Sequence, residues 1–354
     1  MARYRVTVDT GGTFSDFVYL NEETGELSIA KLPSTPEDPS RAISAGIEEL
    51  FATAGERAEI GYFCHGTTVG TNALLEGKGA KTGLLVTEGF RGIYPVGEQA
   101  RPYGTAIFDV MYDKPSPLVP QSLTGEVGDR VDFRGNVLRE LDATALRQTV
   151  RELAAQGVES IAVCLLFSFL HPEHEGRVRE IVLEEIPDCS VSLSCEVLPQ
   201  IREYYRLSTT VINAYLQPIL ERYIAELDRR LRDGGIATRQ KYVMQSNGGM
   251  ETFPAAARRA VTTVLSGPAG GVSAGVLASR TNGQRNIITF DMGGTSCDVA
   301  LIRDGEPSVA SRGKIEGRDL AVPMMDINTV SAGGGTIARA ICVGREVPSS
   351  HLAL

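Results

Sequence analysis

The sequence predicts an α/β fold that is divided into two domains. Strand-like apolar runs alternate with amphipathic helical runs along most of the chain, which is typical of a sheet covered by helices. The chain has 354 residues, a length that accommodates two domains. A stretch near the N-terminus, Val8–Phe17, returns in similar form at Phe290–Val299. We therefore expect one domain at residues 1–200 and a second at 201–354, each carrying one copy of this stretch.

The first copy is predicted to form a β-hairpin that is followed by a helix. Residues 4–8 (YRVTV) and 17–20 (FVYL) favour strands because they are rich in β-branched and aromatic side chains. The Gly-Gly-Thr sequence between them suits a tight turn, since glycine adopts positive φ without steric cost. After a proline-rich turn, the apolar spacing of residues 40–55 predicts a helix with Ser40 as its N-cap.

The middle of the chain continues the alternation of strands and helices. A long helix is expected at 203–231, interrupted at Pro218, and residues 92–140 are rich in loops. The other predicted strands are 61–66, 82–87, 160–170 and 190–194, a strand and turn occupy 242–249, and the other predicted helices start near 71 or cover 143–156 and 175–186.

A run of small residues at 266–275 comes directly before the second copy, whose strands are predicted at 286–290 and 299–302. Small side chains on a helix allow close backbone packing, although glycine lowers the intrinsic stability of that helix. We favour a helix that lies between the two domains and lets them move. The alternative is a glycine-rich loop followed by a buried helix.

The composition indicates a soluble globular protein. Hydrophobic residues make up 42% and charged residues 22% of the chain, which argues against wholesale disorder. The net charge of −9 argues against a nucleic-acid or anionic membrane surface. The six cysteines are scattered without a CxxC motif, and no signal peptide or apolar run near 20 residues is present. These features predict a cytoplasmic protein with free thiols.

The repeated motif Asp-x-Gly-Gly-Thr-x-x-Asp carries the chemistry that we expect. A tight glycine turn presents backbone N–H groups and a threonine hydroxyl to an oxyanion, whereas a carboxylate holds Mg²⁺ that bridges to phosphate. Two such hairpins that face each other would clamp ATP and Mg²⁺, with Asp9 and Asp291 as metal ligands. Asp16 or Asp298 could orient water or the acceptor. The alternative is that each copy is only a hairpin. The expected phosphate-binding residues are Thr10, Gly11, Gly12, Thr13, Gly293, Gly294, Thr295 and Ser296.

Three further segments are candidates for chemistry. In HGTTVGTN, His65 could act as an acid or base and the hydroxyls of Thr67 and Thr68 could contact an oxyanion. Alternatively, a threonine caps the following helix and His65 satisfies a buried carbonyl. HPEH at 171–174 resembles a metal site but more simply begins a helix. QSNGG at 245–249 could line the site or form only a turn.

These motifs resemble the actin-like ATPase superfamily and, more closely, the hydantoinase/oxoprolinase family, in particular its ATP-binding A subunit of the N-methylhydantoinase A type. The resemblance runs from about Arg5 to Ala338 through blocks that include DTGGTFSDF, HGTTVGTNALLEGKGAKTGLLVTEGF, MQSNGGM, LSGPAGG, FDMGGTSCDVALI and AGGGTIA. It implies an actin-like (ribonuclease H-like) ATPase fold with two domains around a nucleotide cleft. It also adds Gly333 and Gly334 to the cofactor-binding residues.

The resemblance further implies ATP-dependent ring opening of a cyclic amide such as hydantoin, N-methylhydantoin or 5-oxoproline. A hydantoinase B-type subunit is the implied partner, so a hetero-oligomer is expected. ATP-dependent carboxylation of a ketone such as acetone or acetophenone is the alternative activity. On this basis the expected catalytic residues are Asp9, Asp16, His65, Asp291 and Asp298.

The chain departs from the family pattern in two ways. Asn328 stands where the family usually has a histidine, and an amide does not titrate, which puts an acid or base role there in doubt. The chain also ends soon after the glycine-rich motif, whereas family members continue to roughly twice this length, so we expect the second domain to be incomplete. These departures leave a third possibility, a non-catalytic, truncated nucleotide-binding protein.

Overall fold

The computed structural model describes residues 2–11, 13–35, 38–54, 59–98, 108–111, 114–292 and 297–330. A six-stranded sheet contains the first hairpin and runs in the order β12-β11-β4-β1-β2-β3. β4 is parallel to both β1 and β11, and the other neighbours are antiparallel. The strands are β1 (Arg3–Thr10), β2 (Phe14–Asn21), β3 (Leu27–Pro33), β4 (Glu59–Thr67), β11 (Lys241–Met244) and β12 (Met250–Thr252).

A second, four-stranded sheet is parallel throughout, in the order β10-β9-β5-β6. Every residue of β5 and β9 is buried, as expected for strands that are covered on both faces. The helices α4 (Ala143–Ala155) and α5 (Glu173–Glu185) pack together against it. Its strands are β5 (Thr82–Thr87), β6 (Thr124–Val127), β9 (Ser160–Cys164) and β10 (Ser190–Leu193).

The strand predicted at 160–170 ends early, at Cys164, because the next two backbone N–H groups bind side chains instead of a neighbouring strand. The N–H of Leu165 donates to Oε1 of the buried Glu175 at 2.9 Å, and the N–H of Leu166 donates to Oγ1 of Thr87 at 3.1 Å. Apolar composition alone does not reveal such side-chain acceptors.

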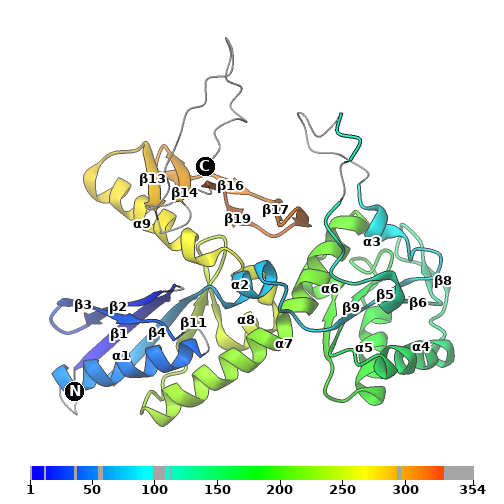
Figure 1. Ribbon diagram of the computed structural model, residues 1–354, viewed down its shortest axis with the longest axis horizontal. Helices are drawn as coiled ribbons and strands as arrows, with labels where there is room; N and C mark the ends of the chain where they lie inside the picture. Colours follow the sequence, from blue (N-terminus) through cyan, green and yellow to red (C-terminus); the bar gives the residue numbers. More distant parts are fainter. Residues whose placement is uncertain are drawn as a thin grey trace.

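The helix α7 (Glu203–Asp233) connects the two sheets (Figure 1). Near its start, Leu207 and Val211 belong to the core under the second sheet. Further along, Leu220 and Leu227 belong to the core under the first sheet. Its 31 residues correspond to about 46 Å at 1.5 Å per residue.

The predicted interruption of α7 at Pro218 is wrong, since the helix continues through this residue. A proline inside a helix removes one N–H and crowds the carbonyls of the preceding turn. Here the carbonyl of Tyr215 accepts a hydrogen bond of 2.9 Å from the N–H of Ala80. Tertiary structure therefore supplies a partner to a carbonyl of that turn.

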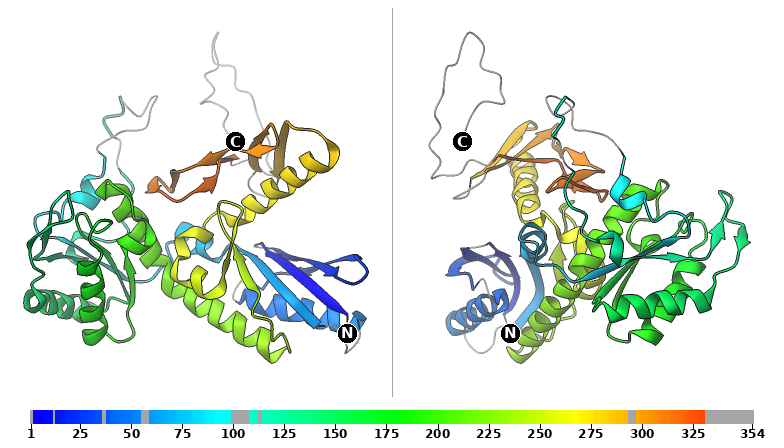
Figure 2. Two further views of the ribbon diagram at one scale, coloured as in Figure 1. Left: turned by 180° about the vertical axis from the view of Figure 1, so that it is seen from behind. Right: turned by 45° about the vertical axis from the view of Figure 1, so that its right-hand side comes forward.

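The second hairpin forms a third sheet with the same register as the first. Asp9 lies opposite Asp16 in the first hairpin, and Asp291 lies opposite Asp298 in the second. The helix of small residues, α9 (Ser266–Asn282), contacts this third sheet and also β4 and β11 of the first sheet (Figures 1 and 2). The third sheet consists of β13 (Ile287–Met292), β14 (Cys297–Arg303), β15 (Glu306–Pro307) and β20 (Ile327–Val330).

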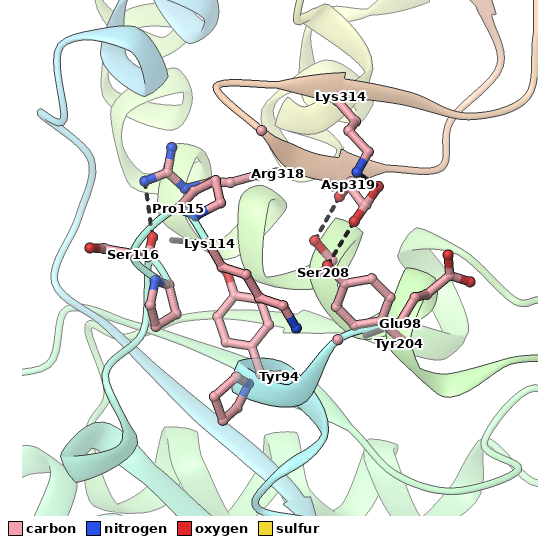
Figure 3. Close-up of a pocket in the computed structure, with 14 residues that line it drawn as sticks. Tyr94, Glu98, Lys114, Pro115, Ser116, Tyr204, Ser208, Lys314, Arg318 and Asp319 are labelled. Carbon is pink, nitrogen blue, oxygen red and sulfur yellow. Dashed lines mark hydrogen bonds and ion pairs between the residues drawn. The ribbon is translucent and has the colours of Figure 1, made fainter. Parts of the chain in front are cut away.

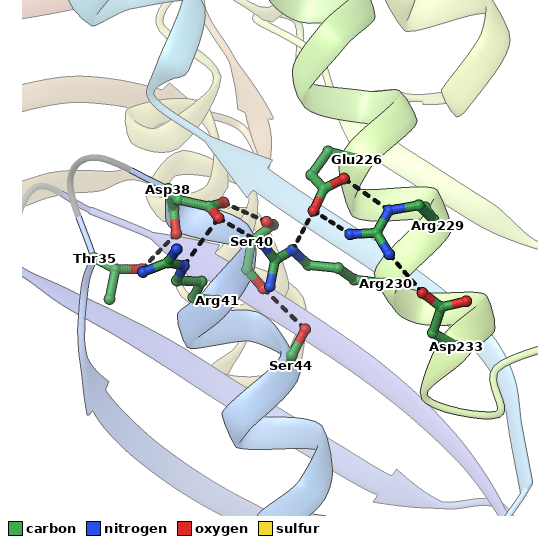
Figure 4. Close-up of polar contacts among 9 residues, drawn as sticks. All are labelled: Thr35, Asp38, Ser40, Arg41, Ser44, Glu226, Arg229, Arg230 and Asp233. Atoms are coloured by element: carbon green, nitrogen blue, oxygen red, sulfur yellow. Dashed lines mark hydrogen bonds and ion pairs between the residues drawn. The ribbon is translucent and has the colours of Figure 1, made fainter.

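An ion-pair network fastens the start of α1 (Pro39–Ala54) to the end of α7 (Figure 4). Nη2 of Arg230 donates to Asp38 at 2.7 Å and its Nε donates to Glu226 at 2.6 Å. Arg229 also donates to Glu226. The helix α1 begins at Pro39, so the prediction of Ser40 as its N-cap is wrong: Ser40 lies in the first turn and its hydroxyl donates to Asp38.

The remaining elements are short. Within the described ranges, no helix is long and apolar enough to cross a membrane. The boundary predicted at residue 200 remains a prediction, although the chain beyond it returns to the first sheet through β11 and β12.

The short helices and strands not yet named are α2 (Val69–Leu75), α3 (Ile93–Val96), α6 (Ser194–Val197), α8 (Phe253–Arg258), the 3₁₀ turns Gln121–Leu123 and Ala260–Thr263, β7 (Arg130–Val131), β8 (Val137–Arg139), β16 (Val309–Ala310), β17 (Gly313–Ile315), β18 (Arg318–Leu320) and β19 (Met324–Met325).

Candidate functional site

The first hairpin presents Asp9 on the face of the first sheet that lies away from its core. Val6, Val8 and Thr10 are buried, so the intervening Asp9 points to the opposite side. The turn is tight, with the N–H of Gly11 donating to the carbonyl of Phe14 at 3.0 Å.

Hydroxyl groups fix the backbone of this turn. Oγ of Ser34, at the end of β3, donates to the carbonyl of Gly11 at 2.8 Å and lies 3.0 Å from Oγ of Ser15. Thr10 is buried, and its carbonyl accepts a 3.3 Å bond from Thr68. Ser15 and Ser34 are positioning residues that the motif alone did not single out.

Gly66 leaves the room that the Asp9 carboxylate occupies. It lies opposite Asp9 in the β1–β4 pair, and a Cβ placed on it would be 2.7 Å from Asp9 Oδ1. Any larger residue would push the carboxylate aside. A glycine inside a strand is the sequence signal for such close approach, and the sequence pattern was not interpreted in this way for Gly66.

The structure brings acidic groups of both hairpins within electrostatic reach. The pKa of Asp9 is raised, first because the surrounding chain removes part of its hydration, and then because the carboxylates of Asp16 and Asp291 repel its charge. Asp16 is also held by Lys31, whose Nζ donates at 2.8 Å. The two copies therefore contribute to one negatively charged region.

In the second hairpin, Asp298 accepts a 2.6 Å hydrogen bond from the hydroxyl of Thr329 on β20. The neighbouring Asn328 pairs with Val299 on β14. Asp291 and Asp298 both line a pocket of about 170 Å³ beside Pro268 of α9. The predicted phosphate-binding residues Gly12, Gly293, Gly294, Thr295, Ser296, Gly333 and Gly334 lie outside the described residues.

The start of α9 meets the end of β4 beside the first hairpin. Oγ of Ser266 donates to the carbonyl of Thr67 at 3.2 Å, and the N–H of Leu265 donates to Oγ1 of Thr71 at 3.0 Å. Thr67 is buried and its Oγ1 accepts from the N–H of Val69. The hydroxyl of Thr67 thus stabilises this junction.

His65 is completely buried. Its Nδ1 lies 3.3 Å from the carbonyl of Val8 and its Nε2 lies 2.6 Å from the hydroxyl of Tyr223. Burial lowers the pKa of His65 to about 4, so the ring is neutral near pH 7. This geometry favours the structural interpretation, and the catalytic role remains a prediction that these contacts do not support.

The two other candidate segments have structural contacts as well. His174 is buried beside Asp129, with 3.2 Å between Nδ1 and Oδ2. Within the part of the chain that the structure describes, no three His, Cys, Asp or Glu side chains are grouped to hold a metal. In QSNGG, the side chain of Asn247 accepts from the N–H of Gly249 and Ser246 donates to the carbonyl of Thr262, as in a local turn.

Both parts of the chain match known proteins. Residues 5–186 match the model of the hydantoinase/oxoprolinase N-terminal region, and residues 206–347 match the hydantoinase/oxoprolinase model. The caprolactamase subunit alpha of Pseudomonas jessenii is 37% identical over 95% of this chain and 49% of its own length. The 5-oxoprolinase 1 of Arabidopsis thaliana is 34% identical over 94% of this chain and 28% of its own length.

A nucleotide-free structure of acetone carboxylase superposes on 96% of this chain and 49% of its own chain, with a TM-score of 0.85 and 28% identity. The predicted α/β, actin-like fold is thereby confirmed. The chain spans half or less of the length of these relatives.

Proposed function

Because the chain belongs to the hydantoinase/oxoprolinase family, we propose that it binds ATP with Mg²⁺ for the ATP-dependent ring opening of a cyclic amide. The observation that carries this proposal is the pair of equivalent hairpins, in which Asp9 faces Asp16 and Asp291 faces Asp298 in the same register. According to their names, the three relatives act on a lactam, on 5-oxoproline and on acetone. The solved caprolactamase of Pseudomonas jessenii and the acetone carboxylase are described as ATP-dependent.

The donor set suits Mg²⁺. This ion usually takes one or two protein carboxylates and completes its octahedral coordination with water and phosphate oxygens. Asp9 and Asp291 would supply those carboxylates, and the cation would offset both the lost hydration and the carboxylate repulsion that raise the pKa of Asp9. A cluster of three protein ligands is not needed for this role.

The chain's own groups would bind and orient the nucleotide. The hydrogen bonds from Gly11 to Phe14 and from Ser34 to Gly11 would hold the turn beside the phosphates, and Gly66 leaves room for the Asp9 carboxylate to hold Mg²⁺ there. Asp16, fixed by Lys31, and Asp298, fixed by Thr329, would orient water or the acceptor. Phosphorylation of the amide oxygen by bound ATP would make the carbonyl carbon easier for water to attack, so that the ring C–N bond breaks and phosphate is released with the ring-opened acid.

The experiment measures Mg-ATP binding by calorimetry. Asp9→Asn and Gly66→Ala should each weaken binding at least about tenfold, since one removes the charge and the other displaces it. Asp188→Asn, at an exposed position away from the hairpins, is the matched control and should leave affinity unchanged. Equal affinity in all four folded proteins would refute the assignment.

The substrate is tested with a hydantoinase B-type subunit present. Phosphate release with hydantoin, N-methylhydantoin, 5-oxoproline or caprolactam, together with ring-opened product, is the expected result. The likeness to acetone carboxylase supports a second candidate, a ketone carboxylase subunit. Phosphate release that requires both a ketone and bicarbonate would favour this second candidate.

A further inference from the structure

A second pocket lies between α3, the start of α7 and the β17–β18 hairpin (Figure 3). Its volume is about 280 Å³. Four segments separated in the sequence form this concave site, and concave sites between packed elements are where small ligands commonly bind. They are the end of α3 with Tyr94 to Glu98, the segment Lys114 to Pro117, the start of α7 with Tyr204 and Ser208, and the β17–β18 hairpin with Lys314 and residues 317–319.

The carboxylates of this pocket are already engaged. Asp319 accepts a 2.8 Å hydrogen bond from the hydroxyl of Tyr204 and lies 3.3 Å from Nζ of Lys314. Glu98 accepts a 2.7 Å bond from the hydroxyl of Tyr205. Asp319 is therefore paired with the cation Lys314, whereas Glu98 is hydrogen-bonded by a neutral hydroxyl and keeps its charge.

The two remaining cations, Lys114 and Arg318, bind only neutral carbonyls. Nζ of Lys114 donates to Val96 at 2.5 Å, and Nη2 of Arg318 donates to Ser116 at 3.1 Å. Neither has a carboxylate within ion-pair distance in the described ranges. Carbonyl oxygens satisfy donors but do not cancel charge, so the three cations of the pocket outnumber its two carboxylates and its net charge is +1, in a chain whose net charge is −9.

Arg318 also carries an unused donor. Its Nε is buried and has no hydrogen-bond partner among the described residues. An unsatisfied buried N–H costs free energy, and a guanidinium fork matches the planar geometry of an oxyanion. Prolines 95, 115 and 117, together with the rings of Tyr94 and Tyr204, provide apolar walls beside it.

We propose that this pocket binds a small oxyanion, with Arg318 and Lys114 as its ligands. Flat apolar walls beside a planar donor suit a carboxylate on a compact ring, and an inorganic or organic phosphate has the same charged chemistry. The site shares no lining residue with the pocket at Asp291 and Asp298, so it is independent of the proposed nucleotide site.

Benzoate and inorganic phosphate serve as separate probes in calorimetry on the full chain. Saturable binding of at least one is expected, and Arg318→Gln and Lys114→Gln should each weaken it at least about tenfold. Arg285→Gln, which makes the same charge change at an exposed position beside Asp304, should not.

The two probes separate the sources of the oxyanion. If benzoate binding depends on Arg318, the pocket is a carboxylate site. If only phosphate binding depends on Arg318, the pocket is a phosphate site. Absence of saturable binding for both probes overturns the proposal. So does binding that is equal in wild type and Lys114→Gln, a substitution of an exposed side chain whose folding is verified by an unchanged melting temperature.

Discussion

Two glycines of α9 offer a direct test of how this helix packs. A Cβ on Gly275 would lie 2.5 Å from Cγ2 of Thr289 and 2.8 Å from Cδ1 of Ile302, whereas a Cβ on Gly271 would have no atom within 4 Å. Both residues lie within the same helix, so a change to alanine gives both the same gain in helix propensity, about 1 kcal/mol. They differ only in the contact with the third sheet.

Gly271→Ala should therefore raise the free energy of unfolding by about 0.5–1 kcal/mol. Gly275→Ala gains the same amount but overpacks the interface, which costs about 1–3 kcal/mol, because Thr289 is β-branched and Ile302 is fully buried. The net expectation is a loss of about 0–2 kcal/mol, so the two variants should differ by about 1–3 kcal/mol.

Urea denaturation measures this difference, provided that the m-value is the same in both variants. If Gly275→Ala is stabilised as much as Gly271→Ala, then α9 does not pack closely on β13 and β14. The interpretation of its small residues as a contact between sheets would then fail. Ala274 is exposed, so enlarging it would not test this interface.

Three further predictions concern titration and reactivity. The pKa of His65 is lowered from 6.5 in the unfolded chain to about 4 in the folded chain, so between these pH values only the unfolded chain binds the proton. The free energy of unfolding should therefore fall by up to about 3 kcal/mol as the pH drops from 6.5 to 4. If urea denaturation gives the same pH dependence of this free energy in His65→Gln as in wild type, His65 is not the cause. Hydrogen bonds from Arg229 and then Arg230 lower the pKa of Glu226 to about 2, so its stabilisation is complete above about 4.5 and lost toward 2. Glu226→Gln should consequently lower the melting temperature more at pH 7 than at pH 3, and equal losses would argue against the network. Burial raises the pKa of Cys164 to about 11, so a thiol reagent at pH 8 should label it only after unfolding, and rapid labelling of this thiol in the native protein would be the contrary result.

Local patterns were sufficient for the parts of the fold that depend on neighbouring residues. Alternating β-branched residues around Gly11 predicted the first hairpin, and the structure has it at β1 and β2. The helix α4 was likewise predicted to within one residue, and Asp142 caps it through the N–H groups of Thr144 and Ala145. In these cases the sequence window contains all the interacting groups.

Long-range contacts decided the rest. The pairing of β11 with β4 joins residues nearly 180 positions apart, which no local period encodes. Burial of His65 against Tyr223 and the partner that Ala80 supplies near Pro218 also depend on distant segments. The space that Gly66 leaves for Asp9 also depends on a distant segment, because Asp9 lies on the neighbouring strand and not in the sequence around Gly66.

The helix α7 joins the first and second sheets into one rigid unit. Side chains from a single continuous rod are built into both hydrophobic cores, so neither core can melt without exposing apolar surface of the other. Heating should then release both sheets in one calorimetric transition. Any displacement of the third sheet would then be taken up by the segments around α9, while the two sheets joined by α7 move together.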